Sequence, residues 1–338
     1  MNAKKVVYVP EFLPPVEPQL KILSEVVTVK TGMAADEADL IARTARADAV
    51  LLTAKTPMTG QVIRACPRLK IIAKYGVGVD NIDIEAATKK GIPVINVPAM
   101  NSNAVAELTI GLMLAIMRHI PRAGERMRNG GWRDESFLGA ELAGSRIGVL
   151  GYGNIAKSVI RKLQGFDVER ILVFSEFLPG DRPEYENVVF TDFRSVLTES
   201  DLVTVHVSLS STTKNMIGAE QIGLMKRTAY LVNAARGPIV DEPALIAALN
   251  ERRIAGAALD VFTEEPPSKD SPLLHMDNVV ITPHLGGSTL RTRRQSVIVL
   301  VNNLVELLKG NSIDSKYVVN PEVYDGGLHS QCQEETIL

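Results

Sequence analysis

Short runs of β-branched and other apolar residues alternate with amphipathic segments along the first hundred residues. The segments Ala35–Ala45 and Thr59–Arg64 carry apolar residues at helical spacing. A longer apolar pattern, Ala104–Arg118, predicts a helix that is ended by Pro121. This alternation predicts a parallel sheet covered by helices. Strands are predicted at Val6–Val9, Val26–Val29, Ala49–Leu52, Lys70–Ala73 and Pro93–Asn96.

The second half of the chain repeats this rhythm. A second long helix is predicted over Leu290–Leu308. Residues 321–338 contain few residues suited to a core and are expected to form an extended or mobile end. Strands are predicted at Arg146–Leu150, Ile171–Phe174, Val188–Phe190, Leu202–Val207, Ala229–Val232, Gly256–Asp260 and Val279–Ile281.

A glycine-rich turn lies near the middle of the sequence, between a predicted strand and an amphipathic stretch, Lys157–Leu163. Its residues are Gly151-Tyr-Gly153-Asn-Ile-Ala156. In this context the first glycine permits a tight turn, and the second lets the backbone approach a pyrophosphate. The small third residue lets helix and strand pack closely, and the helix N-terminus attracts the phosphate charge. The turn therefore predicts a dinucleotide-binding domain that begins near residue 146.

An acidic residue, Glu176, follows Ala156 by about 20 positions, just past the predicted strand Ile171–Phe174. A carboxylate at this spacing binds the adenosine ribose hydroxyls and repels a 2′-phosphate. No arginine follows it, although the hydroxyl of Ser175 would tolerate a phosphate. The alternative is that Glu176 is a solvated charge at a strand end. NAD is the predicted cofactor.

Two α/β domains accommodate this order of elements. We expect a flavodoxin-like substrate domain made of residues 1–102 and 288–338. A doubly wound Rossmann domain that binds NAD, residues 103–287, is then inserted into it. The last long helix returns to complete the first domain. The ligand site is expected in the cleft between the domains, as is common at domain boundaries.

Composition and charge exclude several classes of partner. The chain has 338 residues, of which 46% are hydrophobic and 22% are charged, with a net charge of −2. This balance gives no electrostatic reason to expect nucleic acid or an anionic membrane. No apolar run reaches the roughly 20 residues that span a bilayer, and the first residues lack the apolar core of a signal peptide. Only Cys66 and Cys332 are present, with no cluster of histidine and cysteine, so we expect a cytoplasmic protein without a metal site.

Hydride transfer to a carbonyl also requires a proton donor, and histidine titrates near neutral pH. His284 is the best placed of the five histidines, because it follows a predicted strand and precedes Gly286 and Gly287, where backbone can approach a ligand. His206 lies within an apolar strand and fits a structural role. The other three lie in the tail, at a helix end and in a loop: His329, His119 and His275.

Acidic and basic candidates for the same site follow neighbouring strands. Asp260, Glu264 and Glu265 lie at and beyond the strand Gly256–Asp260. Spacing does not decide between the two glutamates, which also fit an exposed polar loop. Arg236 follows another strand and is suited to hold an anionic substrate.

Several segments resemble motifs of one enzyme family. VNAARGPIVDEPAL, GAALDVFTEEPP and ITPHLGGST resemble the three catalytic motifs of the D-isomer-specific 2-hydroxyacid dehydrogenases. KYGVGVDNIDIEAATKKGIPVINVPAMNSNAVAELTIGLMLA is most similar to the phosphoglycerate dehydrogenase branch. The resemblance extends from about Ala49 to Gly310. It implies a short form without the regulatory domain of the long phosphoglycerate enzymes.

The resemblance implies a reaction and a role for each matching residue. Protonated His284, paired with Glu265, gives a proton to the carbonyl oxygen of a small 2-oxo acid as NADH delivers hydride to C2. Arg236 orients the substrate. The implied substrate contacts include a carboxylate-binding turn and comprise Lys74, Tyr75, Gly76, Val77, Gly78, Asn101, Arg236 and His284. The implied cofactor contacts are Gly151, Gly153, Asn154, Ile155, Glu176, Val207, Ser208, Thr213, Ala234, Ala235, Arg236, Asp260, His284 and Gly287.

Departures from the family's pattern leave the substrate open. Ser208 stands where proline is usual, and Arg291 replaces a usual acidic residue. Thr53 and Lys74 stand where the phosphoglycerate enzymes often carry arginine, so Lys55 and Lys74 would offer a phosphate only point charges. The substrates that stay open are 3-phosphoglycerate, glyoxylate, hydroxypyruvate and other small 2-oxo acids.

Two other functions use the same fold. One is an NAD-sensing regulator without turnover, as in the family's corepressor relatives, and the other is oxidation of phosphite by the same three residues. The resemblance further implies a homodimer. The apolar helix Ala104–Arg118 suits either a dimer interface or the core of its own domain.

Overall fold

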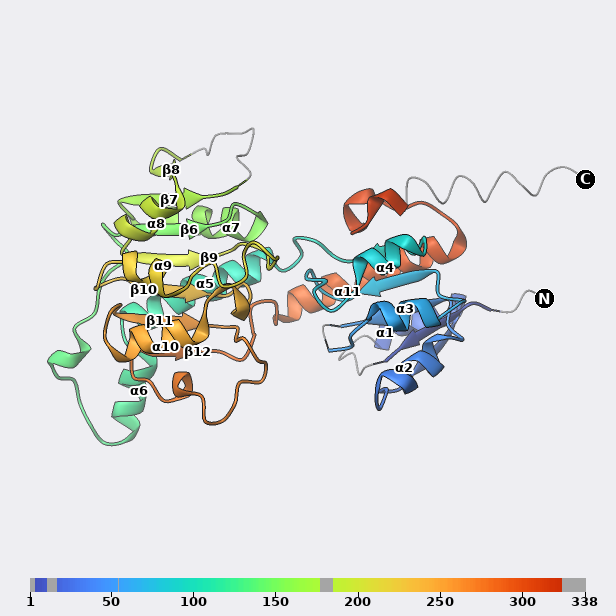
Figure 1. The fold of residues 1–338 in the computed structure, drawn as a ribbon, viewed down its shortest axis with the longest axis horizontal. Coiled ribbons are helices and arrows are strands. Elements are labelled where there is room, and N and C mark those ends of the chain that lie inside the picture. The colour runs from blue at the N-terminus through green and yellow to red at the C-terminus, as the bar shows by residue number, and fades with distance from the viewer. Residues whose placement is uncertain (1–3, 11–16, 54, 177–184, 324–338) are drawn as a thin grey trace, which may run out of the picture. The chain divides into compact units, whose positions relative to one another are not determined.

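A computed structural model of the chain describes residues 4–10, 17–53, 55–176 and 185–323. The chain divides into two compact units (Figure 1). Unit 1 consists of Met1–Asn101 and Thr289–Leu338, and unit 2 is Ser102–Ser288. Unit 2 is therefore inserted in the sequence of unit 1.

Unit 1 contains a five-stranded parallel sheet in the order β2-β1-β3-β4-β5. This is the flavodoxin-like strand order. One face packs against α1 and α11, and the other against α2, α3 and α4. The strands are β1 Val6–Val9, β2 Thr28–Thr31, β3 Ala49–Leu52, β4 Ile71–Lys74 and β5 Val94–Ile95. The helices are α1 Glu17–Val26, α2 Glu37–Thr44, α3 Gly60–Ala65, α4 Ile84–Lys89 and α11 Leu290–Lys309.

The segment after α11 closes one edge of this sheet. A short 3₁₀ turn, η5 Ser315–Tyr317, leads into it, and Val318 forms an antiparallel bridge with Ile95 of β5. The side chain of Asn320 is 1% exposed, accepts a hydrogen bond from the Val94 amide at 2.8 Å and donates to the Ile92 carbonyl at 3.0 Å. These bonds satisfy backbone groups that an edge strand would otherwise leave open.

Unit 2 contains a seven-stranded parallel sheet in the order β12-β11-β10-β9-β6-β7-β8. The strand order reverses between β6 and β9, which is the switch point of a doubly wound Rossmann sheet. One face packs against α5 Ser102–Met117 and α7 Asn154–Leu163, and the other against α8 Phe193–Glu199, α9 Ala219–Leu224 and α10 Glu242–Asn250. The strands are β6 Arg146–Leu150, β7 Arg170–Phe174, β8 Val188–Phe190, β9 Leu202–Val205, β10 Tyr230–Asn233, β11 Gly256–Leu259 and β12 Val279–Ile281.

The two sheets confirm the predicted fold class, but the predicted role of Pro121 is wrong. Helix α5 ends at Met117, and His119 adopts a left-handed backbone with φ 54°. Pro121 lies in the first turn of a further helix, α6 Ile120–Arg128, which the sequence did not predict. Proline suits that position because N–H groups in the first turn of a helix have no acceptor within the helix, so the N–H that proline lacks costs no hydrogen bond. The expected mobile tail falls largely outside the described residues, since 324–338 are not described.

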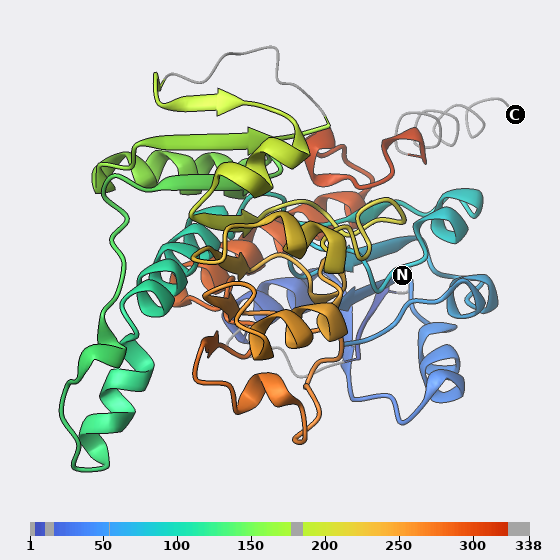
Figure 2. The same ribbon diagram turned by 60° about the vertical axis from the view of Figure 1, so that its left-hand side comes forward.

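Helix α6 and the residues after it form an arm, residues 119–139, that projects from unit 2 (Figure 2). No residue of α6 is buried. The arm returns at Ala140, whose amide donates to the Met117 carbonyl at 3.0 Å. Its exposed apolar side chains are Ile120, Met127, Trp132 and Leu138, the last 88% exposed.

No single helix among the described residues is long and apolar enough to cross a membrane. The helices α5 and α6, which meet at a bend of 60°, reach that length and apolar character only when they are taken together. Most of α5 is buried inside unit 2, as expected of a core helix.

Candidate active site

A histidine and a glutamate meet at the carboxyl end of the sheet in unit 2. His284 follows β12 and Glu265 follows β11, the adjacent strand. His284 Nδ1 lies 2.7 Å from Glu265 Oε2, and both side chains are partly open to solvent. Ligands of open α/β sheets bind at this end of the strands. The pair therefore places a titratable imidazole ring where a ligand can reach it from solvent.

The backbone of His284 is strained and is held by Asp260. His284 has a left-handed backbone with φ 52°, which is unusual for a residue other than glycine. Its amide donates to the Asp260 carbonyl at 2.8 Å. The Asp260 carboxylate is 1% exposed and accepts bonds from the Leu285 amide at 2.7 Å, the Gly286 amide at 2.8 Å and the Thr282 hydroxyl at 2.5 Å. Asp260, expected to contact the cofactor, is thus engaged with the loop that carries the histidine.

Glu265 is oriented by its own loop. Its Oε1 atom accepts a hydrogen bond from the Phe262 amide at 3.2 Å, which leaves Oε2 directed at His284. It is Glu265, and not the neighbouring Glu264, that bonds the histidine, so the structure distinguishes two residues that spacing left equivalent.

The pair shifts the pKa values of both partners. The hydrogen bond and negative charge of Glu265 raise the pKa of His284 above its ordinary value, against the opposing effects of burial and the Arg236 charge. Burial alone would raise the pKa of Glu265, but the hydrogen bond and charge of His284 bring it below its usual range. The arrangement favours imidazolium beside carboxylate.

Arg236 lies just past β10, close enough for its charge to affect both partners. Asn233, 1% exposed, fixes this strand end: its amide group donates to the Arg236 carbonyl at 2.9 Å and accepts from the Ala235 amide at 3.0 Å. Gly237 follows, and a Cβ atom there would lie 1.9 Å from the Phe262 carbonyl carbon. The backbone that bears Arg236 and the backbone that leads to Glu265 are therefore in direct contact.

The glycine turn after β6 has a shape that fits a pyrophosphate. Gly151 has φ 98°, and a Cβ atom on it would lie 2.7 Å from the His206 carbonyl oxygen, so only glycine fits. Gly153 is the N-cap of α7, has no capping side chain and has no atom within 4 Å of where a Cβ would be. The first-turn amides of Asn154 and Ile155 are thus approachable by an anion.

The remaining predicted cofactor residues surround this carboxyl edge. Glu176 is exposed, two residues past β7. Thr213 closes the loop after β9 by donating its hydroxyl to the Ser208 carbonyl at 2.6 Å, and Val207 lies in the same loop. The last three lie next to catalytic candidates, at the end of β10 and after His284: Ala234, Ala235 and Gly287.

The predicted carboxylate-binding turn belongs to unit 1, where it follows β4. Gly76 has φ 124°, and the Asn96 amide group donates to the Val77 carbonyl at 2.7 Å, which fixes the turn through Gly78. Lys74 is 2% exposed and its ammonium donates to the Tyr75 carbonyl at 3.2 Å.

Asn101, the last residue of unit 1 before α5, has a buried side-chain oxygen without a hydrogen-bond partner among the described residues. It is a polar group with capacity for a further bond.

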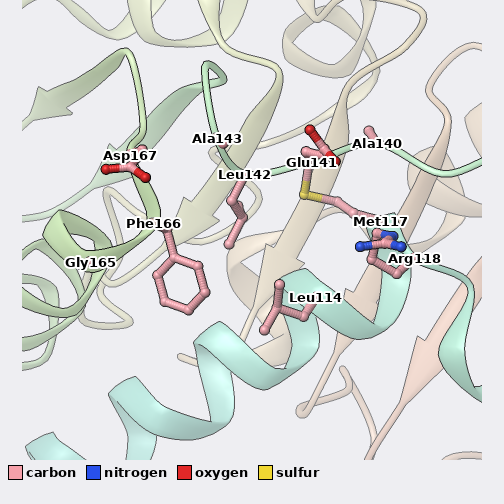
Figure 3. A pocket seen from close by; sticks show the side chains of 10 residues that line it. All are labelled: Leu114, Met117, Arg118, Ala140, Glu141, Leu142, Ala143, Gly165, Phe166 and Asp167. Carbon is pink, nitrogen blue, oxygen red and sulfur yellow. The ribbon is translucent and has the colours of Figure 1, made fainter.

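Described residues of unit 2 line two cavities that each measure about 310 Å³. One is lined by Glu265 and His284 together with apolar side chains such as Phe262, Leu274 and Ile281. The other lies before the amino ends of β6 and β7, between Leu114, Leu142 and Phe166, with Arg118 and Asp167 on opposite sides (Figure 3). That second cavity is remote in the fold from the carboxyl edge where the histidine pair lies.

Four residues that support the site were not anticipated from the sequence: Asn96, Asn233, Gly237 and Thr282. Gly237 begins the short 3₁₀ helix Gly237–Ile239 after β10, whereas the other three are polar residues at or directly after the end of a buried strand. That position is a usable signal, because polar side chains at strand ends in a parallel sheet hold the loops that bind ligands.

Comparisons with known proteins agree with this geometry. The sequence profile of "D-isomer specific 2-hydroxyacid dehydrogenase, NAD binding domain" matches residues 110–286. A D-3-phosphoglycerate dehydrogenase of Methanocaldococcus jannaschii is 42% identical over 90% of the chain, and the chain spans only 57% of that relative's length. A glyoxylate reductase of Thermofilum pendens is 39% identical over 95% of the chain and 96% of the relative.

A solved structure is similar throughout. The D-lactate dehydrogenase of Aquifex aeolicus, in complex with NAD and lactic acid, has a TM-score of 0.85 at 27% identity, over 94% of this chain and 99% of that one. The family match, the full-length relative and the two sheets lead to one conclusion: this chain belongs to the D-isomer specific 2-hydroxyacid dehydrogenase family.

Proposed function

We propose that this chain is an NAD-dependent D-2-hydroxyacid dehydrogenase that interconverts a small 2-oxo acid and its D-2-hydroxy acid. The observation that carries the proposal is the 2.7 Å contact between His284 and Glu265 at the carboxyl edge of the NAD-binding domain. A raised histidine pKa beside an accessible edge suits a group that gives and takes a proton near neutral pH.

The glycine turn would hold the cofactor. Gly151, Gly153 and the first-turn amides of α7 present a concave backbone and a helix N-terminus to a pyrophosphate. Glu176 would accept hydrogen bonds from the adenosine ribose. Bound NADH supplies hydride to C2 of the substrate.

Residues of this chain would stabilise the negative charge that develops on the carbonyl oxygen of the substrate. Protonated His284 donates its proton to that oxygen, and Glu265 stabilises the imidazolium beforehand and fixes the ring orientation. Arg236 binds the substrate carboxylate through its guanidinium group. In the reverse direction neutral His284 accepts the proton from the hydroxyl group.

Replacing Glu265 by glutamine is expected to shift the pH–rate profile to lower pH. Glu265 raises the pKa of His284, so its loss lowers that pKa. Reduction needs protonated His284 and declines as pH rises through this pKa. The declining limb of kcat against pH should therefore begin at lower pH in Glu265→Gln. Glu264→Gln is the matched control and should keep the wild-type profile. If the declining limb of Glu265→Gln begins at the wild-type pH, Glu265 is only a polar loop residue and does not set the pKa of His284.

Cofactor choice gives a second test. If Glu176 binds the ribose hydroxyls, kcat/KM should favour NADH over NADPH by at least about tenfold, the value of one charged hydrogen bond or more. Glu176→Ala should reduce this preference, while Glu186→Ala, an acidic residue of the same unit, should not. Equal use of the two cofactors by the unmodified protein would refute the ribose assignment.

We also propose a homodimer that uses the arm. A helix with no buried residue gains nothing from the core of its own unit, yet this arm exposes Ile120, Met127, Trp132 and Leu138. Apolar side chains gathered on a projecting segment are typical of an interface. A cytoplasmic location is favoured by the presence of only two cysteines in the chain.

A further inference from the structure

The cavity at the amino ends of β6 and β7 takes no part in the proposed reaction. Three segments of unit 2 line it: the end of α5, the chain that returns from the arm, and the turn after α7 (Figure 3). Its volume of about 310 Å³ is at the lower end of the range for pockets that bind small molecules. A small metabolite would fit it, whereas a dinucleotide would not.

Backbone contacts fix the walls of this cavity. The Ala140 amide donates to the Met117 carbonyl at 3.0 Å, and a Cβ atom on Gly139 would lie 2.4 Å from that carbonyl oxygen. On the other side, the Gly144 amide donates to the Asp167 carbonyl at 2.9 Å. The chain that returns from the arm is therefore tied both to α5 and to the turn after α7, so the shape of the cavity is set within unit 2.

The floor of the cavity is apolar. Met117 and Leu142 are buried, and Leu114 and Phe166 are partly buried. Figure 3 shows Leu114, Leu142 and Phe166 between the charged side chains that line the cavity. Covering such a surface with the apolar part of a ligand is favourable because it removes that surface from water. The floor therefore suits a ligand with an apolar body.

Three charged side chains stand at the rim. Arg118 and Asp167 lie on opposite sides of the cavity, and Glu141 adds a second carboxylate. All three residues are exposed, and none of the ion pairs formed among the described residues involves any of them. The next charges along two of the same segments, Arg146 and Glu169, do pair with each other at 2.8 Å. The rim therefore keeps charges of both signs for a ligand.

This rim favours a ligand that carries both charges. With one guanidinium and two carboxylates, its net charge is negative and repels a ligand that is only an anion. A ligand that is only a cation would leave Arg118 without a partner. An ammonium beside Asp167 and a carboxylate beside Arg118 would satisfy both sides. Because these two residues face each other across the floor, the two charges of the ligand must be separated by its apolar body.

We propose that this cavity binds a small zwitterion whose ammonium and carboxylate are separated by an apolar body, as in a short apolar peptide or an ω-amino acid. The guanidinium of Arg118 suits the carboxylate because its parallel N–H groups match the two carboxylate oxygens. A free α-amino acid carries its two charges side by side and would reach only one side of the cavity. The glycine turn of the cofactor site is at the opposite ends of the strands, so this ligand and NADH should bind together.

The first test compares probes of matched apolar length by isothermal titration calorimetry of the full chain, with NADH in excess. Leucyl-leucine and 6-aminohexanoate carry separated charges, whereas hexanoate lacks the ammonium and hexylamine lacks the carboxylate. The Kd of at least one zwitterion should be lower than that of either single-charge probe by at least about threefold, the effect of one ion pair at an open rim. Free leucine should bind as weakly as the single-charge probes. The tighter zwitterion distinguishes a peptide from an ω-amino acid.

Two neutral substitutions assign the two sides of the rim. Asp167→Asn removes the charge and keeps a residue that tolerates the left-handed backbone at this position, φ 52°. It should raise the Kd of the zwitterions at least about threefold without weakening hexanoate, and Arg118→Gln should do the same without weakening hexylamine. Arg161→Gln and Asp270→Asn are the controls, because both are exposed charges of unit 2 outside the cavity, and every Kd should stay at its wild-type value.

A third substitution blocks the cavity without changing its charge. Ala143 is exposed and lines the cavity, so Ala143→Trp should abolish zwitterion binding while the Tm and the Kd for NADH stay near wild type. No binding of either zwitterion at about 10 mM, equal Kd values for zwitterionic and single-charge probes, or full binding in Ala143→Trp would overturn the inference. None of these outcomes requires turnover of a 2-oxo acid, so they are independent of the proposed dehydrogenase function.

Discussion

Replacing His284 by alanine is expected to lower kcat for reduction of a 2-oxo acid by about 10²–10⁴-fold, the usual contribution of a positioned general acid. The loop should survive the change, because Asp260 holds it through the backbone amides of residues 284–286 and the Thr282 hydroxyl, and none of these bonds uses the imidazole. Steady-state kinetics gives kcat, and the fluorescence of bound NADH gives its Kd, which should change less than about threefold.

The matched control is His275→Ala, a histidine in a loop of the same unit. It should keep wild-type kcat and Kd. A His284→Ala variant that loses NADH binding in step with kcat would show a structural effect, and one that retains kcat would remove His284 from the chemistry.

Replacing Gly237 by alanine is expected to destabilise the protein by about 3 kcal/mol or more, at or beyond the upper end of the usual range for overpacking. The new Cβ would lie 1.9 Å from the Phe262 carbonyl carbon and 2.5 Å from the Thr263 amide nitrogen. No rotamer relieves a clash with backbone, so one of the two loops must move. Since these loops carry Arg236 and Glu265, kcat/KM should fall with stability. Urea unfolding and steady-state kinetics check both effects.

Gly223→Ala is the control for this substitution. Gly223 lies within α9, and no atom lies within 4 Å of the position that a Cβ would take there. Alanine at this position should therefore stabilise the protein by about 0.5–1 kcal/mol through its helix propensity. If Gly237→Ala unfolds at the same urea concentration as Gly223→Ala, the close contact between the two loops does not exist in solution.

The alternation of apolar runs is sufficient to predict both sheets, because strands in parallel sheets are buried on both faces and read as continuous apolar segments. Boundaries shift where a strand and a helix share apolar residues. Val26 falls in a predicted strand but ends α1, and β2 begins at Thr28. Helix α6 has apolar residues at helical spacing, at Ile120, Ala123 and Met127, but it is missed because a proline that follows a helical pattern indicates the end of that helix as well as the start of another.

Site residues named from motifs are less fully determined by sequence. The choice between Glu264 and Glu265 depends on how the loop after β11 turns, and that turn is set by the Phe262 amide bonding to Glu265. Asp260 is a second example. Its place in a motif implies a cofactor contact, which stays a prediction, and only the structure reveals that its buried carboxylate binds the backbone around His284. Such roles depend on tertiary hydrogen bonds that no spacing specifies.

The pairing of Tyr75 with Arg293 illustrates a further limit. These residues are 218 positions apart, and only the return of α11 to the first sheet brings them together. The sequence alone marks Arg291 as unusual, whereas the contact between the Tyr75 hydroxyl and the Arg293 carbonyl appears only in the fold.

The most direct test of the proposed activity is NADH oxidation, followed by the loss of NADH absorbance, with purified protein and a panel of glyoxylate, hydroxypyruvate, phosphohydroxypyruvate, pyruvate, 2-oxoglutarate and branched 2-oxo acids. We expect turnover of at least one of them, formation of the D-2-hydroxy acid, and loss of turnover in His284→Ala. Tight NADH binding with no oxidation of NADH by any member of the panel would contradict the proposed activity and would favour an NAD-sensing regulator.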